Sequence, residues 1–443
     1  MNNIINAESY KNQKLCRVRA VTAFITLPKD SNLWYDILAE GKRQCDTLAI
    51  ALQQAGYHVQ SLRLVTNPFG EYLNTSDINT AKKSLAQITQ HLDELNKNNE
   101  LRIRFAIGEA CTAHEIALLP ELIKDYGDLC NACVNVPMNE HGFLQHELIE
   151  QSVQAIQQIA DITPNGEGNF NFTVNFNCDS YIPYFPASYH RPKQANDKAN
   201  VDKAVVVGLE TPDLLVDVLQ SVSPLTLPYQ GEVCENQTSN NVDNCADNHA
   251  EFMQQAYTAM HTALQYHVDK VVGVIDNTSL EQGWQFIGMD TSAAPSKDCA
   301  SMVEVYQLLG VPYFGASGTV EASALLTKVF KSVNNVQQVG FSGLMLAVTE
   351  DTGLAKATIN QQFDIKDLLT YSSVCGIGLD TVPIEGDTPS EKICAIIRDT
   401  GTMAFRLNKP LTVRLFPVPK LTAGEMTSFD SDDLCNCAVL VVP

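Results

Sequence analysis

Short β-branched runs alternate with longer segments whose apolar residues recur at helical spacing, and this alternation constrains the fold most strongly. Strand-like runs lie at residues 16–27, 58–69 and 101–109, and helix-like segments at 31–57 and 78–98 separate them. Parallel strands need long crossover connections, which helices usually supply. The pattern therefore predicts an α/β fold with at least a partly parallel sheet.

The same alternation continues downstream. We expect further helices at residues 146–162 and 252–267. Further strands are expected at 129–139, 169–179, 204–210, 270–276 and 411–419. An α/β barrel often uses about as many residues as the 443 of this chain for a single core. Residues 1–443 are therefore predicted to form a single α/β barrel domain with a short polar N-terminal tail. The Asn-rich stretch at about 230–251 is predicted to be a surface insertion.

Charge and hydropathy restrict the partners. The chain has 51 acidic and 30 basic residues, a formal net charge of −21, which repels nucleic acid and anionic membrane surfaces. It has no run of 18 apolar residues, and its first fifteen residues lack the apolar core of a signal peptide. We therefore expect a cytoplasmic protein that binds a small molecule, neither nucleic acid nor membrane. A homo-oligomer is compatible with this composition.

The cysteines suggest reduced, mostly buried thiols, because there are thirteen of them and no export signal. Two pairs stand apart, Cys130 with Cys133 and Cys435 with Cys437. Together they would supply four thiolates to zinc, but nothing in the sequence brings them together. A zinc site there is left open.

A glycine-rich turn precedes one predicted helix. It runs from Gly315 to Thr319 and contains Ser317 and Gly318. Backbone N–H groups at such a helix start can bind a phosphate or carboxylate. The alternative is an ordinary turn with a hydroxyl N-cap. The turn is thus one candidate for substrate binding.

Several carboxylates follow predicted strands or apolar runs. Such groups can perform acid–base chemistry or hold a divalent cation, although each one can equally cap the next helix. Glu350 and Asp290 are candidates for catalysis. Glu210, Asp276 and Asp351 are candidates for metal binding. The sequence does not identify a cofactor, and a divalent ion is the one that these carboxylates could hold.

A rigid aromatic segment runs from Asn177 to His190, with three tyrosines and two prolines. We expect it either to line a substrate pocket, with His190 as a general acid or base, or to be a packed loop with a satisfied histidine.

Six ordered motifs resemble one protein family. They are "NCDSYIPYFPASYH", "GMDTSAAPS", "FGASGT", "GFSGLMLAVTEDTGLA", "YSSVCGIGLDTVPIEGD" and "RLNKPLTVRLFPVP". In this order they resemble the bacterial and archaeal family called domain of unknown function 711, often labelled PFL family proteins. The resemblance spans nearly the whole chain.

This resemblance implies a ten-stranded α/β barrel like that of pyruvate formate-lyase and related glycyl radical enzymes, with a loop inserted into the barrel. The loop would be "SVCGIGLD", with Cys375 at its tip, Gly376 beside it and Asp380 fixing the loop or taking a proton. Arg414 or Lys409 would stabilise the thiolate. Arg414 is also a candidate for substrate binding.

Radical chemistry does not follow from this likeness. The radical glycine of those enzymes lies near the C-terminus in an Arg-Val-x-Gly-aromatic context, whereas Gly424 is the last glycine here and lies in "TAGEM". The leading hypothesis is therefore a cytoplasmic enzyme without a glycyl radical that acts on a small polar or anionic metabolite through Cys375. The alternatives are a metal-dependent carboxylate enzyme and a non-catalytic metabolite-binding protein.

Overall fold

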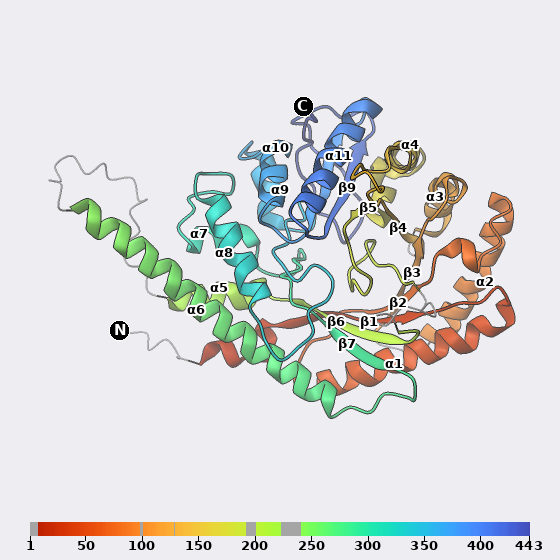
Figure 1. Ribbon diagram of the computed structural model, residues 1–443, viewed down its shortest axis with the longest axis horizontal. Coiled ribbons are helices and arrows are strands. Elements are labelled where there is room, and N and C mark those ends of the chain that lie inside the picture. Colours follow the sequence, from red (N-terminus) through yellow and green to blue (C-terminus); the bar gives the residue numbers. More distant parts are fainter. Residues whose placement is uncertain (1–7, 98–100, 128, 192–200, 223–240) are drawn as a thin grey trace.

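The computed structural model describes residues 8–97, 101–127, 129–191, 201–222 and 241–443, and it has the predicted mixed α/β architecture (Figure 1). In this part of the chain nine strands form one sheet, in the order β7-β6-β1-β2-β3-β4-β5-β9-β8. The strands are β1 (Arg17–Ile25), β2 (Leu62–Thr66), β3 (Ile103–Glu109), β4 (Asn131–Asn135), β5 (Phe172–Phe176), β6 (Ala204–Glu210), β7 (Gln285–Asp290), β8 (Gly378–Glu385) and β9 (Leu411–Val418).

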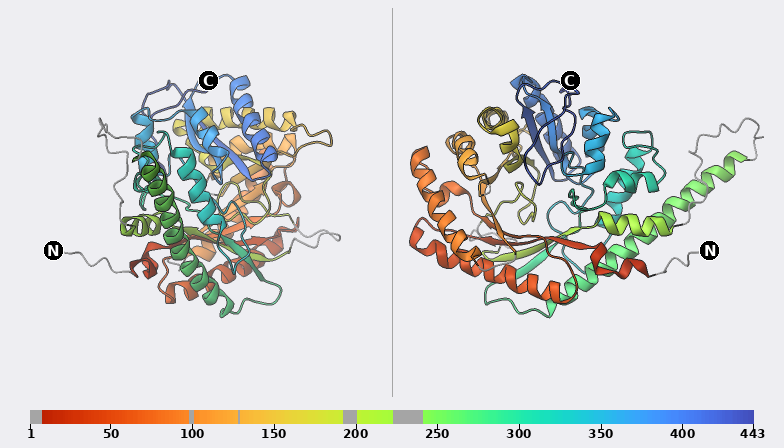
Figure 2. Two further views of the ribbon diagram at one scale, coloured as in Figure 1. Left: turned by 60° about the vertical axis from the view of Figure 1, so that its left-hand side comes forward. Right: turned by 180° about the vertical axis from the view of Figure 1, so that it is seen from behind.

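Helices surround the outer side of this sheet (Figures 1 and 2). The helices of the described residues are α1 (Trp34–Gln54), α2 (Ile78–Asn96), α3 (Ala113–Tyr126), α4 (His146–Ile162), α5 (Pro212–Ser221), α6 (Asn241–Asp276), α7 (Met302–Leu308), α8 (Thr319–Lys331), α9 (Thr352–Ile359), α10 (Ile365–Ser372) and α11 (Ser390–Arg406). Helices α7, α8 and α9 pack mainly on other helices. Local signals set some of these limits. Helix α3, for example, begins at a capping box in which Thr112 and Glu115 bond each other's backbone N–H groups.

The sheet has two halves of opposite direction. Strands β1 to β5 are parallel to one another. Strand β6 is antiparallel to β1, and β9 is antiparallel to β5, while β7 follows β6 and β8 follows β9 in parallel. The N-terminal ends of β1–β5 and the C-terminal ends of β6–β9 therefore share one edge of the sheet.

The closed ten-stranded barrel is not observed, because the described sheet is open and β7 and β8 are its edges. Two isolated parallel bridges lie between these edges: Met289 with Gln338, and Ala347 with Asp380. The chain between Gln338 and Ala347 thus touches both edges without forming a regular strand.

The curved sheet encloses the aromatic segment that was singled out in the sequence. Tyr181, Phe185 and Val206 belong to one apolar cluster on the inner face, and Tyr184 packs against Phe341 in a second cluster. The interior loops are visible inside the curve in Figure 2. The aromatic segment therefore lies inside the sheet's concavity, where Ile377 of the cysteine motif also packs.

The cysteine motif itself was assigned incorrectly. Cys375 lies in the short connection after α10, and Gly378 already begins β8. The predicted inserted loop is therefore a helix-to-strand turn followed by a buried strand.

Two other expectations concern α6. Residues 270–276 were predicted to be a strand, but they form the end of this long helix, because a short apolar run has no period of its own to distinguish the two structures. Of the predicted surface insertion at 230–251, residues 230–240 lie outside the described residues. Residues 241–251 are the helical start of α6.

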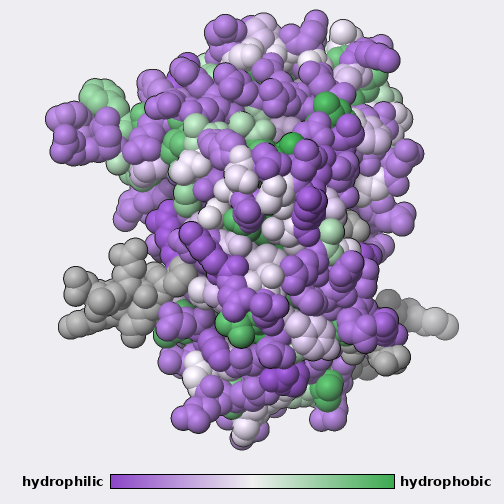
Figure 3. Space-filling model, turned by 90° about the vertical axis from the view of Figure 1, so that its right-hand side faces the viewer, coloured by the Kyte–Doolittle hydropathy of each residue, from purple (hydrophilic) through white to green (hydrophobic). Residues whose placement is uncertain are grey.

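The surface is mostly hydrophilic on the face shown in Figure 3, where apolar residues are scattered. No helix in the described ranges is long and apolar enough to cross a membrane.

Candidate functional site

A cavity of about 810 Å³ opens at the edge where β1–β4 begin. Arg19, Arg63 and Arg104 line it from three neighbouring strands. A smaller chamber of about 50 Å³ lies next to it, and both spaces are lined by Arg19, Arg63, Phe185 and Glu350. We refer to these four residues as the inner site.

Strand alternation explains why arginines line a buried space. Successive side chains of a strand point to opposite faces. Leu62 and Leu64 therefore pack in the main hydrophobic cluster, which includes residues of the outer helices, whereas Arg63 between them lines the cavity. Strand β9 repeats this arrangement with Arg414, which lies between Val413 and Leu415.

Arg414 joins two carboxylates beside the small chamber. Its Nε donates to Asp380 Oδ1 at 2.7 Å, and its Nη2 donates to Glu350 Oε1 at 2.5 Å. Its guanidinium also lies 5.0 Å from the centre of the Phe170 ring. Fork-shaped pairing of this kind fixes the orientation of both carboxylates.

Arg19 carries the charge network across to the first strand. Its Nη1 donates to Gln60 Oε1 at 2.9 Å and to Glu210 Oε2 at 3.4 Å, and its Nη2 lies 3.7 Å from Glu350 Oε2. Glu210 is also bound by Arg17, at 3.1 Å. The Glu350 contact of Arg19 is thus its loosest one.

Arg63 differs from these arginines because no carboxylate of the described residues lies within ion-pair distance of it. It is 7% exposed. Its Nε donates to Ser61 Oγ and its Nη1 to the carbonyl oxygen of Pro183, both at 3.1 Å. Its guanidinium lies 4.9 Å from the ring centre of Phe185.

This environment is costly for the positive charge of Arg63. Burial, together with repulsion from Arg19 and Arg104, lowers its pKa to about 9. Arg104 is its register neighbour on β3, but Arg104 has Asp433 as a partner at 3.1 Å. An anion in the cavity would offset the unbalanced charge of Arg63.

Glu350 is the carboxylate of the inner site. Its side chain is 13% exposed. Burial raises its pKa, and Asp380 acts in the same direction, while Arg414 and Arg19 oppose the shift. A carboxyl group with a raised pKa in a cavity is a candidate for donating or accepting a proton.

Asp290 and Asp351 were predicted as site residues, and both have their hydrogen-bonding capacity used within the fold. Asp290 accepts bonds from the backbone N–H groups of Ser292, Phe341 and Ser342 and from the Ser292 hydroxyl. Burial raises the pKa of Asp290 to about 6 against these bonds. Asp290 therefore ties two interior loops together.

Asp351 caps helices. It accepts bonds from Gly353 and Leu354 at the start of α9 and from Met302 at the start of α7. The Ser301 hydroxyl also donates to it, at 2.5 Å. Although adjacent in sequence, Glu350 and Asp351 serve different parts of the molecule.

The predicted metal ligands do not converge in the described residues, where no group of three or more His, Cys, Asp or Glu side chains is arranged to hold an ion. Glu210 is bound by Arg17 and Arg19, and Asp276 is exposed at the end of α6. Cys130, Cys133 and Cys437 are buried free thiols, and Cys435 is partly buried.

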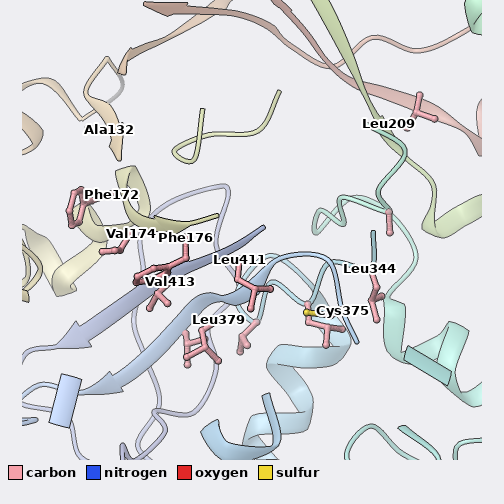
Figure 4. Close-up of a cluster of buried hydrophobic side chains, with 14 of the residues drawn as sticks. Ala132, Phe172, Val174, Phe176, Leu209, Leu344, Cys375, Leu379, Leu411 and Val413 are labelled. Carbon is pink, nitrogen blue, oxygen red and sulfur yellow. The ribbon is translucent and has the colours of Figure 1, made fainter. Parts of the chain in front are cut away.

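Cys375 is fully buried and does not line either cavity. Figure 4 shows its sulfur among the hydrophobic side chains of Leu344, Leu379 and Leu411. Gly378 N–H approaches the sulfur at 3.5 Å, and Lys409 Nζ donates to the Cys375 carbonyl oxygen rather than to the thiol. A catalytic role for Cys375 stays a prediction, and this geometry does not favour it.

His190 is likewise fully buried and outside both cavities. Its Nε2 lies 3.2 Å from Thr26 Oγ1, and its Nδ1 has no partner among the described residues. Burial lowers its pKa to about 4, so it is neutral at physiological pH. Its predicted acid–base role also stays a prediction.

The glycine-rich turn lies at the start of α8, away from the inner site. Thr319 Oγ1 accepts from Gly315 N–H and donates to the carbonyl oxygen of Ala316, while Ser317 and Gly318 are exposed. Gly315 and Gly318 have φ values of 101° and 100°, which glycine adopts without strain. The turn is a glycine turn, as in the alternative, but the N-cap of α8 is Gly318 and no hydroxyl caps the helix. Substrate binding here stays a prediction. Gly376, the remaining predicted binding residue, is buried against Gly343.

Sequence reasoning found Glu350, Asp380, Arg414 and the aromatic segment, but it missed Arg19 and Arg63. The missed signal was an arginine between large apolar residues in a strand-like run: "LRL" at 62–64, "IRF" at 103–105 and "VRL" at 413–415. A charge at such a position must face solvent, as Arg104 does, or a polar interior or a ligand.

Comparisons with known proteins all match this chain to uncharacterised protein families. The family described as "Uncharacterised ACR (DUF711)" matches residues 10–431. A "UPF0210 protein" of Lactobacillus helveticus is 26% identical over 71% of this chain, and the match covers 63% of that protein, less than two thirds of its length. A "UPF0210 protein" of Actinobacillus pleuropneumoniae and "UPF0210 protein MJ1665" of Methanocaldococcus jannaschii are each 23% identical, over 90% of this chain and 83% of theirs. The match along residues 10–431 shows that the chain belongs to the DUF711 family of uncharacterised proteins.

Proposed function

We propose that this protein is an enzyme that acts on a small anionic metabolite bound at the inner site. Arg63 carries this proposal, because it is a buried cation that lines a large cavity and has no carboxylate partner in the described part of the chain. Folding an unpaired charge into the interior lowers stability. A bound anion explains why such a residue is kept there.

The cavity also fits a metabolite in size. Its volume of about 810 Å³ lies within the usual range for small-molecule sites, about 300–1,000 Å³. The anionic group would bind between Arg63 and Arg19. The rest of the ligand would contact the polar outer wall, which includes Gln60, Asn96 and Asn131.

Glu350 gives the site its chemistry in this proposal. It adjoins both arginines and the small chamber, where it would act as a general acid or base. Asp380 and Arg414 hold its orientation and are positioning residues. The supporting fact is that its pKa is raised in a solvent-accessible cavity.

We also infer that the sheet functions as a barrel-like enclosure. The bridges of Gln338 to β7 and of Ala347 to β8 are what a tenth strand between the two edges would make. They support the likeness to the barrel of glycyl radical enzymes in architecture only. Radical chemistry is no part of the proposal.

Arg63→Met tests the proposal. Isothermal titration with inorganic phosphate and with malonate should show binding by the wild-type protein and affinity at least tenfold weaker in the variant. The loss of a charge-assisted hydrogen bond, about 1.5–3 kcal/mol, sets this magnitude. Without anions, the melting temperature of the variant should stay the same or rise, because an unbalanced buried charge is removed.

Arg43→Gln is the matched control. Arg43 is an exposed arginine of α1 that pairs with Glu281 at 3.0 Å, outside the cavity, so its loss should leave anion binding unchanged. Equal anion affinity in Arg63→Met and wild type would refute the proposal. A large drop in melting temperature with no change in binding would make Arg63 a structural residue.

A further inference from the structure

The small chamber beside the inner site is lined by two unlike sets of side chains. One set belongs to a single buried apolar cluster on the inner side of the sheet. Its members that line the chamber are Tyr184, Ala187, Ala294, Phe341, Met345 and Ile377. The other set is charged and consists of Arg19, Arg63, Glu350, Asp380 and Arg414. A ligand group that enters the chamber therefore meets an apolar wall as well as charges.

Most polar groups of this lining are already bonded within the protein. The hydroxyl groups of Thr173 and Thr412 bond each other, and Thr173 also donates to the carbonyl oxygen of Val413 at 3.0 Å. The Tyr184 hydroxyl donates to the carbonyl oxygen of Leu209 at 2.9 Å. A buried water needs about three hydrogen bonds, and few partners for it remain near the apolar wall. An apolar ligand group suits this part of the chamber better than water does.

The volume of the chamber limits the size of such a group. It is about 50 Å³, whereas an apolar cavity of about 150 Å³ is needed to hold the six carbons of benzene. By this proportion the chamber has room for about two carbon atoms. A methyl or ethyl group fits, and a ring or a longer chain does not.

Arg63 lies where the chamber meets the large cavity, because it lines both spaces. Its Nε and Nη1 atoms are used by Ser61 and Pro183, and its Nη2 makes no hydrogen bond to the described residues. An anion that binds this guanidinium group is therefore next to the chamber. A substituent on the atom beside the charged group can reach the apolar wall.

We propose that the ligand of the inner site is a small organic anion with a short aliphatic group, of one or two carbons, beside its charged group. The charged group binds at Arg63, the aliphatic group occupies the small chamber, and any polar remainder contacts the large cavity. This inference rests on the proposed function and specifies its substrate class.

Met345 and Ile377 set the length of the aliphatic group in this proposal. They are 4% and 5% exposed and belong to the apolar wall. Both line the chamber, and neither lines the large cavity. Shortening either side chain therefore enlarges the space for the aliphatic group and leaves the contacts of the anion in place.

Malonate and its methyl, ethyl, propyl and butyl derivatives are the probes, in titration calorimetry at pH 8, where every member is a dianion. The affinity of the wild-type protein should rise about fourfold with each of the first two carbons, since one buried CH₂ group is worth about 0.8 kcal/mol. Butylmalonate should bind at least tenfold more weakly than ethylmalonate, because the longer chain overfills the chamber.

Met345→Ala should bind butylmalonate at least tenfold more tightly than the wild type does, with malonate affinity unchanged within about twofold. Ile377→Val is a milder variant that removes a single carbon from the same wall. It should bind propylmalonate about fourfold more tightly, relative to ethylmalonate, than the wild type does. A fold lost in Met345→Ala therefore leaves the prediction testable in Ile377→Val.

Met260→Ala is the matched control. Met260 is a fully buried methionine of α6 in the main hydrophobic cluster and lines neither space. Its removal makes a comparable vacancy elsewhere in the core, so this variant should keep the chain-length preference of the wild type.

The outcomes separate the two proposals. If malonate binds and neither the methyl nor the ethyl group improves its affinity, the inference is wrong and the anion site stands. A wild-type chain-length preference in the folded chamber variants also overturns the inference. If neither malonate nor phosphate binds to the wild type, both proposals fail.

Discussion

Glu350 and Asp351 are neighbours in the sequence, yet their side chains lie in different surroundings. Glu350 faces the cavity and two arginines, whereas Asp351 is buried between two helix starts. Both are carboxylates, and both follow the same apolar run. The direction in which each side chain points decided their roles.

Cys375 was a prominent candidate in the sequence, but its side chain is buried away from solvent. We predict that a short pulse of N-ethylmaleimide on the native protein leaves Cys375 unmodified, because the sulfur is fully buried. Cys111 is an exposed cysteine and should be modified earlier. Peptide mass spectrometry of samples taken over time gives the rate at each site.

The labelling experiment also tests the proposed thiol nucleophile. Urea at an unfolding concentration should make both cysteines react and serves as the positive control. Modification of Cys375 at the native rate of Cys111 would mean that this turn opens to solvent. It would restore Cys375 as a candidate nucleophile.

Among the elements, α7 and α9 are joined by one carboxylate. Asp351 accepts N–H groups from both helix starts, so its removal leaves unsatisfied donors in two helices. We predict that Asp351→Ala lowers the free energy of unfolding by about 2–4 kcal/mol, roughly twice the usual value for one N-cap. Urea denaturation monitored by circular dichroism measures this.

Asp364→Ala is the comparison for this variant. Asp364 caps only α10, in an exposed capping box with Asp367, and its loss should cost about 1 kcal/mol. Equal losses in the two variants would show that the link from Asp351 to α7 adds no stability. Anion binding should remain in both, since neither residue lines the cavity.

At the scale of the whole molecule, His190 is expected to influence how stability depends on pH. Its pKa in the folded state is about 4, lowered by burial, against about 6.5 in an unfolded chain. Between these values the unfolded state binds the proton and the folded state does not. The contribution of His190 to the free energy of unfolding is therefore fully present above pH 6.5 and is lost as the pH falls toward 4.

We predict that His190→Gln loses less stability than wild type between pH 7 and pH 4.5. The difference should be about 2–3 kcal/mol, since each pKa unit is worth about 1.4 kcal/mol. Asp290 titrates in the same window in the opposite sense, but it is present in both proteins and cancels in the comparison. Parallel pH profiles of the two proteins would contradict this assignment.

The sequence by itself determined much of the local structure. Strand and helix periodicities placed β1 to β6, β9 and α4 close to their observed limits, because these patterns depend on residues a few positions apart. It failed at residues 270–276, where an apolar run without a clear period belongs to α6. It also failed at Gly378–Asp380, where glycines suggested a loop and the chain forms β8.

Only the tertiary structure decided which polar residues meet. Arg19 and Arg63 come from neighbouring strands, but Glu350 lies hundreds of residues further along the chain, and the curvature and register of the sheet bring all three to one cavity. The sequence could place an arginine in a buried strand, but it could not reveal whether a carboxylate lies opposite. For Arg63 no described carboxylate does, and that long-range fact makes it the strongest candidate for binding an anion.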